Sequence, residues 1–156
     1  MAFATPSYVS GKTLADILTG TDINLTSATF KVALFTDAGT AGVKDNVESY
    51  AAAPYNANEV TSANYTAGGL TLTGGTTLTA GTPAGRIIFD DSAATRSWSN
   101  VTWSGAGAAR GALVYADSFT PKRVVCAINF GSDRSVTAGT FTITWDATNG
   151  IFYATY

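Results

Sequence analysis

The sequence has no histidine, which excludes histidine-based acid–base catalysis and every histidine metal ligand. Its single cysteine, Cys126, excludes an internal disulfide and a cysteine-rich zinc site. Charged residues make up 13% of the 156 residues and the net charge is -2, so we expect no nucleic-acid binding. Apolar runs are far shorter than the roughly 20 residues that span a bilayer, so we expect no membrane insertion. The first residues lack a basic segment followed by a long apolar one, so we expect no signal peptide.

The residues that are abundant favour packed β-structure. Hydrophobic residues make up 46% of the chain and aromatic residues 12%, which is enough for a core. Alanine and threonine are frequent, and there are 16 glycines. This composition is typical of proteins that build extended sheets and pack against a neighbouring subunit.

Residues 1–28 are predicted to form an N-terminal arm with one short helix at about residues 11–19. Pro6 interrupts the small polar residues at its start. Leu14, Ile17 and Leu18 then follow helical spacing, and Gly20 stands where a helix would end.

Residues 29–156 are predicted to form one mainly β domain, a single β-sandwich or a jelly-roll-like domain. Its clearest alternation places Phe141, Ile143 and Trp145 on one face of a strand. Asn149-Gly150 predicts a tight turn before the last strand. Residues 38–85 form a long loop region that contains two short strands. The predicted strands are 29–36, 70–73, 76–79, 86–90, 101–103, 110–116, 123–130, 140–146 and 151–155.

Two motifs that suggest chemistry have simpler interpretations. Residues 10–13 read Ser-Gly-Lys-Thr, the end of a phosphate-binding loop, but Pro6 replaces the required glycine and no strand precedes it. We therefore interpret this segment as a helix start. Asp90 and Asp91 are adjacent in a strand and point to opposite faces, so they are predicted to be solvated carboxylates at a strand end.

A metal site and a reactive thiol are weakly supported. Asp37, Asp45 and Glu48 are near in sequence and leave a loop calcium site open as an alternative, although no stretch matches the ligand spacing of an EF-hand. Cys126 lies in an apolar strand and is predicted to be a buried, inert thiol. The overall prediction is a chain with no catalytic residue, no cofactor and no metal.

The aromatic residues divide into core and contact candidates. Trp145 alternates with core residues, whereas Trp98 stands in the polar run 96–100, which we interpret as a loop that contacts a partner. The arm and the long loop are the other segments able to reach a neighbour. The predicted partner-contact residues are Phe3, Pro6, Tyr8, Tyr50, Tyr55, Tyr65 and Trp98.

From about residue 29 onward the chain resembles a family of small virion proteins of tailed bacteriophages. Four segments carry the resemblance: 30–36, 58–74, 89–91 with 101–103, and 130–136 with 139–146. Members of that family are regarded as non-enzymatic head-decoration or minor tail proteins. The resemblance implies a virion component, made in the host cytoplasm and located at the surface of the phage particle.

The leading hypothesis is a capsid decoration, or cement, protein that binds the major capsid protein or other virion subunits and stabilises the head shell. A homo-oligomer, with a trimer favoured, suits that role. A minor tail or tail-tip protein is the first alternative. A carbohydrate-binding module that recognises a host glycan through Trp98 and tyrosines is the second.

Overall fold

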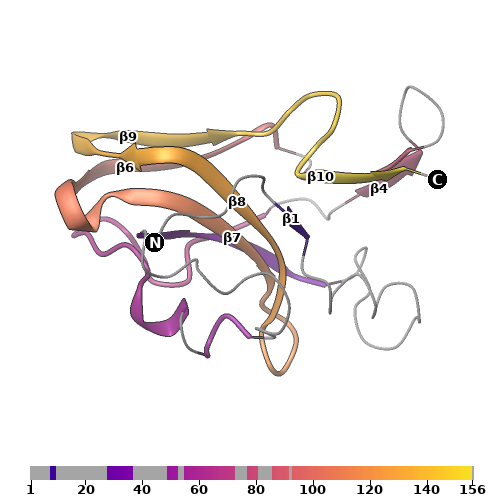
Figure 1. Ribbon diagram of the computed structural model, residues 1–156, viewed down its shortest axis with the longest axis horizontal. Coiled ribbons are helices and arrows are strands. Elements are labelled where there is room, and N and C mark those ends of the chain that lie inside the picture. The colour runs from indigo at the N-terminus through magenta and orange to yellow at the C-terminus, as the bar shows by residue number, and fades with distance from the viewer. Residues whose placement is uncertain are drawn as a thin grey trace.

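The computed structural model describes residues 8–9, 28–36, 49–52, 55–72, 77–80, 86–91 and 93–155. This part of the chain is mainly antiparallel β, as predicted, with ten strands in three sheets (Figure 1). Two short 3-10 helices, Tyr55–Ala57 and Gly105–Gly107, complete the described elements. The predicted helix at about residues 11–19 lies outside the described residues.

The largest sheet has five strands in the order β1-β8-β7-β2-β3. Their bounds are β1 Tyr8–Val9, β8 Arg123–Arg134, β7 Ala109–Ala116, β2 Phe30–Phe35 and β3 Leu70–Thr71. Strand β2 lies between β7 and β3, and it carries apolar residues on both faces, which are covered. Its Val32 pairs with Val114 of β7 and with Leu70 of β3, and Val32 is fully buried.

A second sheet pairs β6 (Thr95–Trp103) with β9 (Val136–Thr144). It faces the large sheet, and Figure 1 shows it as a separate layer beside β7 and β8. The pairing is regular from Thr95 to Trp98 and then shifts twice, where Asn100 and Ala138 adopt positive φ. Such register shifts interrupt the regular ladder of hydrogen bonds between the two strands.

The third sheet is small and has the order β10-β5-β4. Its strands are β4 Thr77–Ala80, β5 Arg86–Asp90 and β10 Phe152–Thr155. The predicted turn before β10 is present, with the Gly150 N–H donating to the Asp146 carbonyl at 2.8 Å and Gly150 at φ 62°. The strand that leaves this turn pairs with β5, so the chain changes sheet there.

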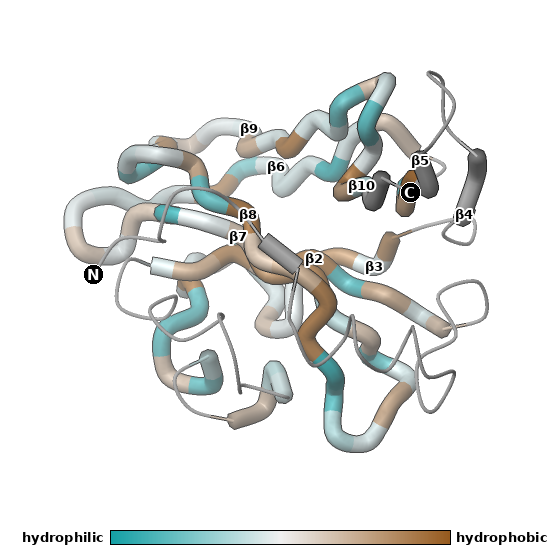
Figure 2. The backbone as a smooth tube through the Cα atoms, turned by 45° about the vertical axis from the view of Figure 1, so that its right-hand side comes forward, coloured by the Kyte–Doolittle hydropathy of each residue, from teal (hydrophilic) through white to brown (hydrophobic). Residues whose placement is uncertain are grey.

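The main hydrophobic core lies between the large sheet and the β6–β9 pair. It joins Val32 of β2, Val114 of β7 and Val125 of β8 to Trp103 and Ile143 of the second sheet. Figure 2 shows the hydrophobic stretches of β2, β7 and β8 crossing the middle of the molecule.

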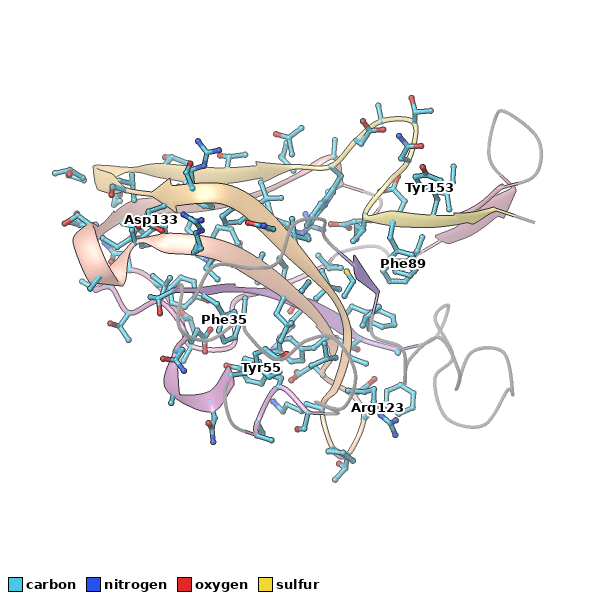
Figure 3. All side chains as sticks on the ribbon, in the orientation of Figure 1. Phe35, Tyr55, Phe89, Arg123, Asp133 and Tyr153 are labelled. Carbon is cyan, nitrogen blue, oxygen red and sulfur yellow. The ribbon has the colours of Figure 1, made fainter. Side chains whose placement is uncertain are left out.

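A smaller core covers the opposite face of the large sheet. Phe35 and Tyr55 are both fully buried there, with ring centroids 5.7 Å apart in an edge-to-face contact. Figure 3 shows these two residues on the side of the sheet away from β9. Residues 49–52 and 55–57 thus lie over this face of the large sheet.

Candidate functional site

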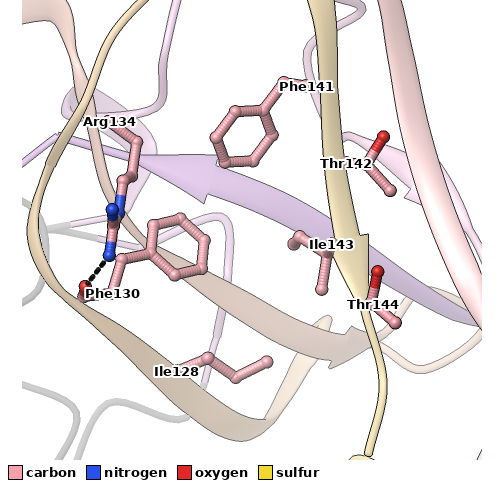
Figure 4. Close-up of a pocket in the computed structure, with 7 residues that line it drawn as sticks. All are labelled: Ile128, Phe130, Arg134, Phe141, Thr142, Ile143 and Thr144. Atoms are coloured by element: carbon pink, nitrogen blue, oxygen red, sulfur yellow. Dashed lines mark hydrogen bonds between the residues drawn. The ribbon is translucent and has the colours of Figure 1, made fainter.

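A groove opens between β8 and β9, at the side where the two facing sheets meet solvent. Ile128, Phe130 and Arg134 of β8 line one wall, and residues 141–144 of β9 line the other. Its volume is about 420 Å³. Figure 4 shows the side chains of Ile128, Phe130, Phe141 and Ile143 directed into the space between the strands.

The apolar floor of the groove follows from strand alternation. Phe141 and Ile143 face inward from β9, as predicted, while the intervening Thr142 is exposed. The rings of Phe130 and Phe141 lie 5.8 Å apart at 50° and are both only half-buried. Both rings keep part of their surface open to the groove, where an apolar side chain of another molecule could pack against them.

Arg134 places a positive charge at one end of the groove. Its Nη2 donates to the carbonyl oxygen of Phe130 at 3.0 Å, and its own carbonyl accepts from Trp103 Nε1 at 2.8 Å. The side chain is exposed. Within the described residues no carboxylate pairs with it, whereas the neighbouring Asp133 lies 3.4 Å from Arg110.

Strand β9 also offers a backbone edge. In the described ranges its one neighbour in a sheet is β6. Every second residue of an edge strand directs its N–H and C=O away from the paired strand. The groove therefore combines an apolar floor, a cation and a row of peptide groups.

Asp91 forms a buried polar centre, which corrects the prediction of a solvated carboxylate. Its side chain is fully buried, and its Oδ2 lies 2.5 Å from Arg96 Nη2. The indole Nε1 of Trp145 donates to the same carboxylate at 3.2 Å. These bonds tie the residue that follows β5 to Arg96 of β6 and to Trp145, which directly follows β9, so Asp91 has a structural role.

Glu59 organises a second polar cluster beside β2. Its carboxylate accepts hydrogen bonds from the hydroxyls of Tyr50 and Tyr65, the latter at 2.7 Å, and from the Gly68 N–H at 2.8 Å. The hydroxyl of Tyr65 also accepts from the Leu34 N–H at 2.8 Å. The cluster therefore anchors residues 59–68 on the large sheet.

A stacked tyrosine pair adjoins this cluster and shares its environment. Tyr50 and Tyr115 stack with centroids 4.2 Å apart. Burial raises the pKa of Tyr50, Tyr65 and Tyr115 well above the ordinary tyrosine value, and Glu59 adds to the increase. These phenols stay protonated and act as hydrogen-bond donors.

The raised tyrosine pKa values predict a loss of stability in alkali. Since the unfolded chain releases its phenol protons near pH about 10, the contribution of these groups is complete below that pH and is lost above it. We expect the free energy of unfolding, measured by urea titration, to fall steeply above about pH 10. Tyr65→Phe should make that fall shallower, because it removes one of the buried phenols. Equal slopes for Tyr65→Phe and the parent protein would refute this interpretation.

The predicted partner-contact residues have different positions in the structure. Tyr55, Tyr65 and Trp98 are buried within the chain, at 0%, 8% and 3% exposure, because they pack into its two cores. Their rings are therefore not surface contacts here. Tyr50 is half-buried against Tyr115.

The interpretation of residues 96–100 as a loop is wrong, because they belong to β6. Trp98 points inward from this strand, between Tyr65 and Phe141, with centroids 6.0 Å from each. The polar residues on either side of it point outward. That period of two was a signal for a strand that the composition of the segment obscured.

Of the predicted N-terminal arm, the structure describes only residues 8 and 9. Phe3 and Pro6 lie outside the described residues. The backbone of Tyr8 belongs to β1, where it pairs with Ala127 of β8. The arm thus joins the large sheet of its own chain at this point.

Burial of Cys126 is confirmed, at 2% exposure. Burial raises the pKa of its thiol to about 12. We expect no reaction of the native protein with a disulfide reagent such as Ellman's reagent at neutral pH, since the thiolate is the reactive form. The urea-unfolded chain serves as the control and should react at once. A native protein that reacts as fast as the unfolded chain would contradict the burial.

The proposed calcium ligands Asp37, Asp45 and Glu48 lie outside the described residues. In the ranges that are described, no group of three or more acidic or cysteine side chains is placed to hold a metal ion. No helix among the described residues has the length and apolar character to cross a membrane. Comparisons of the chain with protein-family models, curated proteins and solved structures give no match.

Proposed function

We propose that this chain is a non-enzymatic structural protein of a bacteriophage particle, and that it decorates and stabilises the head shell. In this proposal its facing sheets form a β-sandwich whose open side binds a neighbouring virion subunit. The observation that carries it is the groove between β8 and β9, where half-buried aromatic rings lie beside an unpaired strand edge in the described structure. Such a surface is stabilised when a partner covers it.

The low charge of the chain supports an assembly role. Charged residues make up 13% of the sequence. Desolvating an unpaired charge at an interface costs several kcal/mol, so a surface with few charges is buried more easily. The resemblance of residues 29–156 to small virion proteins points in the same direction.

Shell stabilisation would arise by mass action. A protein that binds the assembled lattice, and not the free capsid subunits, shifts the equilibrium toward the lattice. A homo-oligomer, with a trimer at a local three-fold axis favoured, would present several copies of the groove at once. Linked copies bind a lattice more tightly than single ones.

Gold labelling of phage particles tests this function. Particles are purified from a lysate of cells that make the protein, treated with an antibody to it and viewed by electron microscopy. Gold over the heads is the expected result. Gold confined to the tail would replace the decoration role by that of a minor tail protein, and unlabelled particles would refute a virion role.

A further inference from the structure

We propose that the β8–β9 groove binds an extended segment of a partner protein that is apolar at alternate positions and carries a carboxylate facing Arg134. This inference rests on the proposed function, because it names the chemistry of the subunit that the chain would bind. It depends on three features of the groove, which are the edge of β9, the apolar floor and the guanidinium.

The edge of β9 favours a ligand with an extended backbone. A strand laid beside β9 would receive main-chain hydrogen bonds from residues that direct their peptide groups away from β6. Within the described ranges β9 pairs with β6 alone, so over Phe141–Thr144 its other edge carries no strand from that part of the chain. A helix would not match this row of peptide groups.

The apolar floor of the groove favours a segment with an apolar side chain at every second position. An added strand directs every second side chain toward the space that Phe130, Phe141 and Ile143 line. Apolar side chains there would complete the burial of two rings that are half-buried in the free chain. The other side chains of the segment would face solvent and would be polar.

Arg134 favours a carboxylate in the bound segment. In the described structure the guanidinium of Arg134 donates one hydrogen bond, to the Phe130 carbonyl oxygen. Its other N–H groups can therefore donate to a ligand. A carboxylate matches the fork of these donors and would form a charge-assisted pair. The adjacent Asp133 lies near Arg110 and is largely exposed, so the end of the groove keeps its positive charge.

The lining favours a peptide over a glycan. Its side chains are apolar or threonine apart from Arg134, with no carboxylate or amide to bind sugar hydroxyls. Phe130 and Phe141 are tilted by 50°, so they do not form one flat platform for a sugar ring. Main-chain pairing and apolar burial, in contrast, both suit a polypeptide.

Selection from a displayed library of random peptides tests the proposal, with the full-length protein as bait. We expect enriched peptides to alternate apolar and polar residues and to contain Asp or Glu near one end. Arg134→Glu should weaken their binding about tenfold or more and should select basic peptides instead, since the charge at the groove is reversed. Because Arg134 is exposed, this variant keeps the core intact.

Two further variants define the site. Phe141→Ser removes a floor ring and should abolish binding of the enriched peptides. Thr140→Ser changes an exposed residue of the same strand that is not part of the lining, and it should bind as the parent does. Circular dichroism of each variant establishes that it is folded.

Several outcomes would overturn the inference. They are no enrichment, enrichment without acidic residues, and equal binding by Arg134→Glu. A glycan array that gives binding lost in Arg134→Glu, with no peptide enriched, would assign the groove to a sugar. Gold on the phage heads together with a failed selection would leave the decoration role standing and remove this inference alone. Successful selection together with unlabelled particles would support peptide binding by the groove and refute the decoration role.

Discussion

Asp91→Ala is expected to lower the free energy of unfolding by about 3–5 kcal/mol, the usual cost of removing one partner of a buried ion pair. The substitution leaves the guanidinium of Arg96 buried without the carboxylate that lies 2.5 Å from it. It also removes the acceptor of the Trp145 indole N–H. Urea unfolding followed by tryptophan fluorescence measures the change.

A surface pair provides the matched control for Asp91. Asp133→Ala removes a carboxylate that is 57% exposed and lies 3.4 Å from Arg110. That change should cost less than about 1 kcal/mol, because exposed ion pairs contribute little. The double variant Asp91→Ala/Arg96→Met should recover part of the loss, since it removes the unpaired charge. Equal effects of the two single alanine variants would contradict the structural role of Asp91.

Gly69→Ala is expected to destabilise the protein by about 3 kcal/mol, from backbone strain and a steric clash together. Gly69 has φ 70°, and a Cβ atom there would lie 1.9 Å from the Val32 carbonyl oxygen. The clash is with the backbone of β2, which lies between β7 and β3 in the large sheet. This backbone cannot shift without breaking its hydrogen bonds to those two strands. Thermal unfolding or urea titration measures the loss.

Gly105→Ala separates strain from clash. Gly105 also has positive φ, 56°, but no atom lies within 4 Å of the added Cβ. The strain of the left-handed backbone conformation should then be the one cost, and it should lower the free energy of unfolding by about 1 kcal/mol. If both variants lose the same stability, the close approach of Gly69 to β2 is not important.

Strands with a dense run of apolar residues were predicted well from the sequence. The prediction for β2 at 29–36 is confirmed by a strand at Phe30–Phe35, and that for β5 at 86–90 is confirmed without change. The inward faces of Phe141 and Ile143 are also confirmed. In each case the side-chain pattern of one segment contains the information, and no distant partner is needed.

Residues whose role depends on distant partners were predicted poorly. Asp91 was interpreted as solvated because its contact with Trp145, 54 positions away, cannot be read from local spacing. Tyr65 was interpreted as a partner contact because its segment lacks regular structure. Its hydrogen bonds to Glu59 and to the β2 backbone bury it instead.

The groove was missed because it depends on how β8 and β9 lie beside each other, which the pattern of one segment does not contain. Of its lining residues only Arg134 falls outside the predicted strands. The prediction ended β8 at residue 130, whereas the strand continues to Arg134. Strand β9 begins at Val136 and not at residue 140. The polar residues between these limits belong to strands at the open side of the two sheets, where alternation is weak on the exposed face.

Electron cryomicroscopy of the gold-labelled particle would test the central claim most directly, because it shows which face of this chain meets the phage shell. We expect the neighbouring subunit to cover the β8–β9 side, with one of its extended segments beside β9 and a carboxylate of that segment at Arg134. A map in which this groove faces solvent while another face binds the particle would contradict it.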